Sequence, residues 1–240
     1  MVRVAAVGDL HFGRHSPEDL AGLVPEMMAA ADVVALCGDL TDHGLPDEAR
    51  SLARELAGPG RPPVVAVLGN HDYEAGRAEE VAGILREAGV HVLDGDTVEL
   101  RGIGFAGVKG FGGGFGAHAL QAWGEELMKR FVHEAIEEAL KLERAIARLS
   151  TAHRVVLLHY APIEATVRGE AAEIYPFLGS SRLEEPLSRH PVSAILHGHA
   201  HHGQLRGETR TGVPVFNVAA ALLQQHAGRR FHVLELPAPA

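Results

Sequence analysis

The sequence predicts an α/β protein built around a parallel β-sheet. Three times near the start of the chain, an apolar, valine-rich run ends in a short polar loop and is followed by a helical pattern. This strand–loop–helix repeat is typical of βαβ units, in which the strands pair in parallel and helices cover the sheet. Further apolar runs follow at closer spacing, which indicates antiparallel pairing and a second sheet.

The first elements are recognised by their apolar runs and by their helix start signals. Ser16 and Pro17 have the residue types preferred at a helix N-cap and at the first helical position. Gly58-Pro59-Gly60 ends a later helix. The predicted strands are Val2–Val7, Val33–Leu36 and Val64–Leu68, and the predicted helices are Pro17–Ala31, Pro46–Leu56 and Gly76–Ala88.

After these repeats the strands become closely spaced, and Asp94-Gly95-Asp96 supplies a turn between the first two. A glycine-rich segment, Gly110–Gly116, precedes a long helical stretch over Ala117–Ser150, whose apolar stripe includes Trp123 and Leu127. The later predicted strands are Val90–Leu93, Val98–Arg101, Ile103–Val108, Val155–Leu158, Ser193–Leu196, Val213–Val218 and Phe231–Leu236. We expect one domain over residues 1–240, with a helical insertion at about 110–150.

The composition of the chain argues against several classes of protein. The 240 residues are 46% hydrophobic and carry a net charge of −9 without basic runs, so the electrostatic footprint of a nucleic-acid binder is missing. No stretch approaches the ~18 apolar residues of a membrane span. The single cysteine, Cys37, permits no intramolecular disulfide, and Val4–Val7 is too short for a signal peptide. We expect a cytoplasmic protein, and the sequence leaves open whether it forms a homo-oligomer.

Metal-binding residue types collect after the apolar strands. The carboxyl ends of strands in an open α/β sheet are where ligands bind. The residues at these ends are Asp9 and His11, Asp39 and Asp42, Asn70, His71 and Asp72, His159, and His199 and His201. Carboxylate, imidazole and amide donors suit divalent Mn, Fe or Zn and lack the thiolates of a structural zinc site. They are too many for one tetrahedral ion, and paired ions are typical of phosphatases and nucleases.

The order of these motifs resembles the calcineurin-like metallophosphoesterases. The resemblance covers residues 9 to 201 and rests on Asp9-Leu10-His11, Gly38-Asp39-Leu40-Thr41-Asp42, Gly69-Asn70-His71-Asp72, His159 and Gly198-His199-Ala200-His201. It implies a four-layer sandwich of two mixed β-sheets flanked by helices.

The resemblance also implies a role for each motif residue. Asp9, His11 and His201 would hold one divalent ion. Asn70, His159 and His199 would hold a second, and Asp39 would bridge the two. His71 would be the catalytic acid, and Asp42 would orient and charge it. A hydroxide bridging the ions would attack phosphorus in line with the leaving group.

Two motifs of this chain differ from those of the protein phosphatases in the family, and these differences limit the classes of substrate. Protein phosphatases of the family carry Asp-Arg-Gly where this chain has Asp42-His43-Gly44, and Gly-Asn-His-Glu where it has Gly-Asn-His-Asp. The motif forms are closer to bacterial cyclic-nucleotide-type phosphodiesterases. The resemblance therefore implies a small phosphorylated substrate, with a phosphodiester or phosphomonoester bond of a nucleotide or cyclic nucleotide as the bond that is hydrolysed. A nuclease, a phosphoprotein phosphatase and a non-catalytic scaffold on the same fold remain the alternatives.

Further residues are assigned by their position in the sequence or by comparison with known motifs. Gly110–Gly116 lacks the Lys-Ser or Lys-Thr of a Walker-type loop and is interpreted as a rim loop near the site. His197 and His202 are expected to support or border the ligands. Residues placed by position alone near the phosphate or leaving group are Tyr160, Arg168, Tyr175, Ser180, Ser181 and Arg182.

Overall fold

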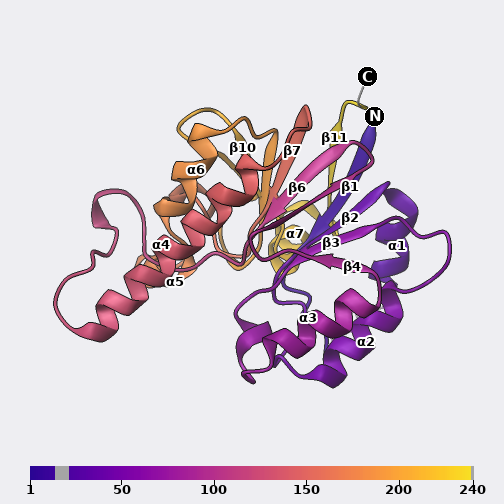
Figure 1. Ribbon diagram of the computed structural model, residues 1–240, viewed down its shortest axis with the longest axis horizontal. Helices are drawn as coiled ribbons and strands as arrows, with labels where there is room; N and C mark the ends of the chain where they lie inside the picture. The colour runs from indigo at the N-terminus through magenta and orange to yellow at the C-terminus, as the bar shows by residue number, and fades with distance from the viewer. Residues whose placement is uncertain (14–21, 239–240) are drawn as a thin grey trace.

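The computed structural model describes residues 1–13 and 22–238 and has four layers, with two β-sheets face to face and helices outside them (Figure 1). The first sheet has the strand order β11-β1-β2-β3-β4, and the second has the order β5-β6-β7-β8-β10-β9. The strands are β1 (Val2–Val7), β2 (Val33–Cys37), β3 (Val64–Val67), β4 (Val90–Val92), β5 (Asp96–Leu100), β6 (Ile103–Gly107), β7 (His153–Leu157), β8 (Ala194–His197), β9 (Arg206–Glu208), β10 (Pro214–Asn217) and β11 (His232–Leu236). The predicted four-layer α/β sandwich is confirmed.

Both sheets are mixed, with parallel strands in the middle and antiparallel strands at the edges. β1 to β4 run parallel, and β11 pairs with β1 in the antiparallel sense. In the second sheet β6, β7, β8 and β10 are parallel, whereas β5 and β9 are antiparallel edge strands. All carboxyl ends of the central strands therefore lie at one edge of each sheet.

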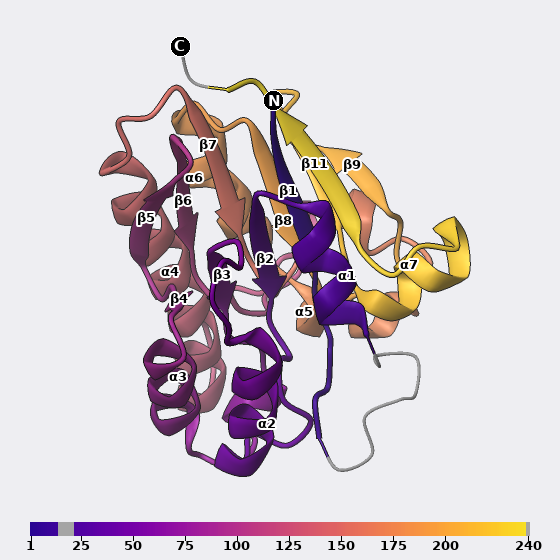
Figure 2. The same cartoon turned by 90° about the vertical axis from the view of Figure 1, so that its right-hand side faces the viewer.

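Helices cover the outer faces of the two sheets (Figures 1 and 2). α1 packs against β1 and β2 and α3 against β4, while α4 packs against β5 and β6. The helices are α1 (Leu23–Ala30), α2 (Pro46–Leu56), α3 (Ala78–Glu87), α4 (Glu126–Ala147), α5 (Tyr175–Leu178), α6 (Glu184–Arg189) and α7 (Ala220–Ala227). The bounds predicted for α2 are confirmed, and Glu48 in its first turn accepts the Leu45 N–H at 3.2 Å.

The apolar core has two parts because the second sheet is covered on both faces. Val155 and Leu157 of β7 belong to the cluster between the two sheets. Val156 and Leu158 belong to the cluster beneath α4, together with Leu142. Side chains alternate between the faces of a strand, so a strand buried on both faces must be apolar throughout. This explains the unbroken apolar runs in the sequence.

The predicted antiparallel pairing is confirmed for β5 with β6 but is wrong for β4, which pairs in parallel with β3. Asp94-Gly95-Asp96 is not a hairpin turn. The Leu93 N–H donates to Ala66 of the first sheet at 2.8 Å, and the Gly95 N–H donates to Gly107 of the second sheet at 2.8 Å. The chain crosses from one sheet to the other at this point, which local sequence pattern does not reveal.

The long helix begins later than predicted, at Glu126 instead of Ala117. Gly124 has a φ of 77°, and the Leu120 N–H donates to the Gly113 carbonyl at 2.7 Å, so the segment before α4 is held as an irregular loop. Trp123 and Leu127 were expected on the apolar stripe, yet they are 75% and 77% exposed.

Other predictions from the sequence are confirmed only in part or stay untested. Of the helix predicted over 17–31, the structure describes α1, and Ser16 and Pro17 lie outside the described residues. The short elements β9, α5, α6 and α7 were not predicted.

A single domain with an insertion at about 110–150 stays a prediction. Within the described residues, no helix is long and apolar enough to cross a membrane.

Candidate metal centre

The structure brings the predicted ligands to the edge where the carboxyl ends of the parallel strands meet. Asp9 and His11 follow β1, Asp39 follows β2, and Asn70 follows β3. From the second sheet, His159 follows β7, and His199 and His201 follow β8. β2 contacts β7 and β3 contacts β6 across the sheets, so the loops of both sheets converge at one place.

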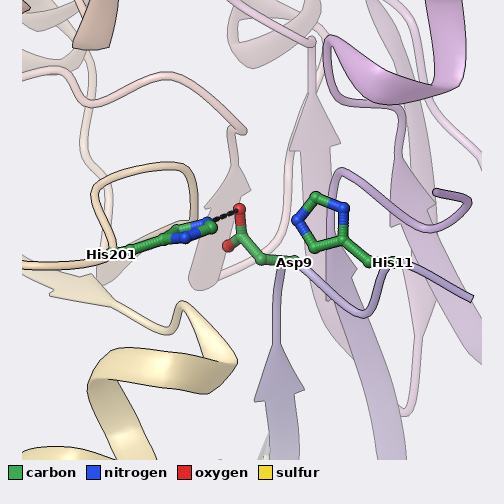
Figure 3. Close-up of side chains that lie close together, drawn as sticks. All are labelled: Asp9, His11 and His201. Atoms are coloured by element: carbon green, nitrogen blue, oxygen red, sulfur yellow. Dashed lines mark hydrogen bonds and ion pairs between the residues drawn. The ribbon is translucent and has the colours of Figure 1, made fainter. Parts of the chain in front are cut away.

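A first group of donor atoms consists of Asp9, His11 and His201 (Figure 3). One donor atom from each residue lies within 4.8 Å of those from the others. His201 Nε2 donates to Asp9 Oδ1 at 2.9 Å, and His11 lies on the other side of the carboxylate. Two imidazoles and a carboxylate around one point form a suitable donor set for a divalent transition metal.

A second group consists of Asp39, His159 and His199, again with donor atoms within 4.8 Å of one another. His159 Nδ1 donates to the Cys37 carbonyl at 3.0 Å, which points Nε2 toward Asp39 and Asn70. The distance from Nε2 is 3.3 Å to Asp39 Oδ1 and 2.9 Å to Asn70 Oδ1. The amide oxygen of Asn70 therefore lies beside this group.

The carboxylate of Asp39 lies between the two groups. Its Oδ2 is 3.9 Å from His11 Nε2 of the first group, and its Oδ1 is 3.3 Å from His159 Nε2 of the second. Asp39 is buried, so its orientation is set by its surroundings. One oxygen therefore faces each group.

Backbone conformation marks the same residues independently. Among the described residues, the non-glycine positions with positive φ are Asp9 (60°), His11 (44°), Asp39 (48°), Arg101 (55°) and His199 (70°). Such conformations cost roughly 1–3 kcal/mol each and cluster at functional sites. Arg101 belongs to the hairpin between β5 and β6, so every other instance falls on a candidate ligand.

Two motif glycines are required because ligands pass close to them. A Cβ at Gly69 would overlap the Asp39 carboxylate, and a Cβ at Gly198 would overlap Asp9 Oδ2. The His199 N–H, directly after Gly198, donates to Asp9 Oδ1 and Oδ2 at 3.0 Å. These glycines let ligands from different loops approach each other.

Charge coupling keeps the carboxylates ionised. Burial favours the neutral form of Asp39, but the positive charge and hydrogen bond of His159 outweigh it and lower the pKa of Asp39. Burial also favours the neutral form of Asp9, but the His201 hydrogen bond helps to outweigh it and the pKa of Asp9 is lowered. Burial opposes the charged form of His159, yet the charge of Asp39 prevails and raises the pKa of His159 to about 9. Burial, followed by the charge of His159, lowers the pKa of His199 to about 4. The positive charge of His159 thus balances part of the negative charge of Asp39.

His71 lies at the edge of the cluster. Its backbone N–H donates to Asp39 Oδ1 at 2.8 Å, and its ring centroid is 4.5 Å from that of His11. His71 Nδ1 is 2.7 Å from the backbone carbonyl of Asp42, whereas the Asp42 carboxylate is 3.6 Å from His11 and 3.4 Å from His43. The Asp42 carboxylate was expected to contact His71. Instead, the main-chain carbonyl of Asp42 makes the contact.

Sequence reasoning placed Asp72 after β3 but assigned it no role. Its buried carboxylate accepts the Leu40 N–H (3.2 Å), the Thr41 N–H (2.8 Å), the Thr41 hydroxyl (2.6 Å) and the Gly69 N–H (2.8 Å). It joins the loops that carry Asp39 and Asn70. The available signal was the acidic residue that directly follows Asn70-His71.

The remaining histidines of the final motif lie outside both groups. His197 is buried and bonds the Gly198 carbonyl (2.8 Å) and the Thr166 hydroxyl (2.9 Å), and burial lowers its pKa to about 4. The His202 backbone N–H donates to Glu170 at 2.7 Å.

Of the residues placed by position alone, Tyr160 has its ring 4.5 Å from that of His199. Arg168 instead pairs with Glu164 at 3.4 Å.

The sequence match decides the family. The family model of calcineurin-like phosphoesterases matches residues 2–203. The chain belongs to this family. No curated protein is a significant match to the chain.

Solved structures share the fold of this family member. Phosphopantetheinyl hydrolase from Mycobacterium tuberculosis is 15% identical, with a TM-score of 0.66 over 95% of this chain and 92% of that chain. The TT1561 protein of Thermus thermophilus is also 15% identical, with a TM-score of 0.56 over 97% of each chain. At this level of identity the likeness establishes the fold.

The donor set fits the metal dependence of the family. The two groups supply carboxylate and imidazole donors with an amide oxygen beside them, which are ligands that Mn, Fe and Zn accept. Cys37 is buried within β2 and belongs to neither donor group, and burial raises the pKa of its thiol well above the ordinary value. These residues could hold metal ions.

Proposed function

We propose that the chain is a phosphoesterase that uses two divalent ions, with Mn, Fe and Zn as the candidates. The observation that carries this proposal is the placement of Asp39, whose two oxygens face different groups of donors. A carboxylate between two donor groups is the arrangement needed to hold a pair of ions close together.

Each ion would have its own ligands. Asp9, His11 and His201 would hold the first, Asn70, His159 and His199 the second, and Asp39 would contact both. When bound, the ions would activate water for attack on phosphorus and neutralise the charge of the phosphoryl oxygens. The buried carboxylates, ionised at neutral pH, provide the negative charge that retains the cations.

His71 would supply a proton to the leaving oxygen. The Asp42 carbonyl can only accept a hydrogen bond, so His71 Nδ1 carries a proton in that contact. In the imidazolium form Nε2 would carry the second proton, and its transfer to the leaving oxygen would return the ring to the neutral Nδ1–H form. A histidine fixed in this way beside the donor groups can act as a general acid.

The substrate would be a small phosphorylated molecule, with a nucleotide or cyclic nucleotide as the leading candidate. A nuclease is disfavoured by the net charge of −9. A non-catalytic scaffold is disfavoured because every expected ligand position is occupied by a suitable donor. Cytoplasmic location and oligomeric state stay predictions from the sequence.

The test is Asp39→Asn, with Asp96→Asn as the matched control because Asp96 is an exposed carboxylate in β5. We expect two ions per wild-type chain by elemental analysis, and hydrolysis in a panel of phosphomonoesters, phosphodiesters and cyclic nucleotides with added Mn. Asp39→Asn should lower metal content and reduce turnover by at least about a hundredfold. Full turnover with normal metal content in this variant would exclude the bridging role.

A further inference from the structure

A pocket of about 350 Å³ opens beside the second donor group. Asn70 and His199 line it together with Phe111, Phe131 and Phe177. Small-molecule sites of this kind are concave and mostly apolar, with a few polar groups that fix orientation. A substrate phosphate at the donor groups would place its organic part at the mouth of this pocket.

The wall of the pocket is a continuous series of rings that begins at a candidate ligand. The ring of His199 is 4.5 Å from Tyr160, Tyr160 is 5.9 Å from Phe111, Phe111 is 4.8 Å from Phe131, and Phe131 is 6.2 Å from Phe177. These centroid separations are in the range of favourable aromatic pairs. An additional ring could therefore join this series.

Segments far apart in the sequence build this wall. Phe111 belongs to the glycine-rich segment after β6, Phe131 to α4, and Phe177 to α5, which is drawn next to α4 in Figure 1. His199 Nε2 donates to the Phe177 carbonyl at 3.1 Å, so α5 is tied directly to the donor group. The position of Phe177 relative to the candidate centre is thus fixed by a hydrogen bond.

Among the described residues, the lining of this pocket includes no carboxylate and no Lys or Arg side chain. Burial raises the pKa of Tyr160, so its hydroxyl is neutral, and the Lys109 ammonium lies 4.8 Å from the Phe111 centroid but does not line this pocket. A larger hollow of about 750 Å³ lies on the Asp42 side of the centre and differs in character. There, Arg50 pairs with Asp47 at 2.6 Å, and Arg77 Nε donates to Glu80 at 2.9 Å.

Exposed apolar side chains mark the entrance. Phe177 is 59% exposed and Ile174 is 40% exposed, although both line the pocket. Large apolar side chains grouped on a surface are typical of binding sites. Here they adjoin the candidate centre.

We propose that this pocket binds an uncharged aromatic ring in the organic part of the phosphoester substrate, with Phe131 and Phe177 as specificity-determining residues. The inference rests on the proposed phosphoesterase function. It assigns the class of substrate as phosphoesters that carry a planar, uncharged ring system, and it disfavours those with a further charged group at that end.

The test compares 2-phenylethyl phosphate with ethyl phosphate, and their methyl diesters, on the Mn-loaded protein. Both leaving groups are simple alkoxides, so the difference in kcat/KM reports on the ring and not on leaving-group acidity. We expect a preference for the phenyl compound of about tenfold or more. A carboxylate on the para position of the ring should abolish it.

Two variants test whether the preference for the phenyl compound depends on the pocket. Phe177→Ala removes an exposed side chain, so the fold should tolerate it, and the phenyl preference should fall by about three- to tenfold. Trp123→Ala is the control, because Trp123 is also an exposed aromatic residue but does not line the pocket. It should leave the preference unchanged. Phe131→Leu keeps an apolar side chain in α4 and should lower the preference without unfolding the helix.

A binding measurement separates this inference from the proposed function. Isothermal titration calorimetry would compare 2-phenylethylphosphonate with ethylphosphonate, neither of which can be hydrolysed as an ester. Hydrolysis without any phenyl preference overturns the pocket and leaves the phosphoesterase function standing. Absence of hydrolysis with a phenyl preference that Phe177→Ala diminishes overturns the function and supports the pocket. Absence of both overturns both.

Discussion

At the scale of single residues, a variant of His71 can distinguish a role in proton transfer from a role in metal binding. Its Nδ1 bonds the main-chain carbonyl of Asp42 at 2.7 Å, so its orientation does not depend on the Asp42 side chain. His71 also lies with His11 and Asp39 in a group whose donor atoms are within 4.8 Å of one another. A role as general acid and a role as metal ligand therefore make different predictions for the same variant.

His71→Ala should retain both ions and lose roughly 10²–10⁴-fold in turnover, as expected for a lost general acid. The loss should be smaller for p-nitrophenyl esters, whose leaving group needs little protonation. Elemental analysis and kinetics with good and poor leaving groups are the measurements. Asp42→Asn keeps the main-chain carbonyl and should not reproduce this pattern. A variant that loses metal, or that slows both esters equally, would rule out the leaving-group acid.

The candidate ligands could be predicted because their residue types follow apolar strands in a recognisable order. The contact between His71 and Asp42 could not be predicted, since a main-chain carbonyl has no sequence signature. Asp72 illustrates the same limit. Its type was visible after β3, but its hydrogen bonds to Thr41 and Gly69 depend on the approach of two loops.

At the scale of elements, Asp72 joins the loop after β2 to the loop after β3. Burial raises its pKa, although the Gly69 and Thr41 hydrogen bonds act in the opposite direction. Loss of this carboxylate would leave several buried donors without an acceptor. These loops carry Asp39 and Asn70, so their relative position bears directly on the second donor group.

Asp72→Ala should lower the free energy of unfolding by about 3 kcal/mol or more, because each buried donor left unpaired costs roughly 1–3 kcal/mol. Urea denaturation measures this. Asp96→Ala, at an exposed aspartate of β5, should change stability by no more than about 0.5 kcal/mol. Equal stability of the two variants would show that the loops are held together by other contacts.

Strands were predicted more accurately than helices for a physical reason. A strand buried on both faces needs an unbroken apolar run, which β2 and β3 supply along their whole length and β1 supplies from Val4 onward. The partner of a strand depends on tertiary structure, so the parallel pairing of β4 was missed. The start of α4 was misplaced because Trp123 and Leu127 fit helical spacing but lie exposed. Short helices such as α5 carry too few residues for a periodic pattern.

At the scale of the whole molecule, both donor groups need both sheets. The first combines Asp9 and His11 of the first sheet with His201 of the second, and the second combines Asp39 with His159 and His199. A bound ion would therefore connect the two sheets. Anything that binds only the folded chain raises its stability in proportion to the logarithm of its concentration.

Removal of metal with EDTA should lower the melting temperature, and Mn should restore it. At a free Mn concentration about a thousand times Kd the gain is about 4 kcal/mol per site. For a chain of this size that corresponds to roughly 10 °C. Differential scanning calorimetry measures the shift, and Asp39→Asn should show a smaller one. Identical melting with and without Mn would argue against ligands from both sheets.

The wide sequence separation of the ligands has a consequence for the order of events during synthesis. Asp9 and His201, which bond each other at 2.9 Å, are 192 positions apart in the chain. Contacts between such distant residues form slowly, because a long loop must close before they can be made. A nascent chain that has completed β1 to β3 holds only part of each donor group. Tight binding of a metal ion would therefore require that β8 has been made and has joined its sheet.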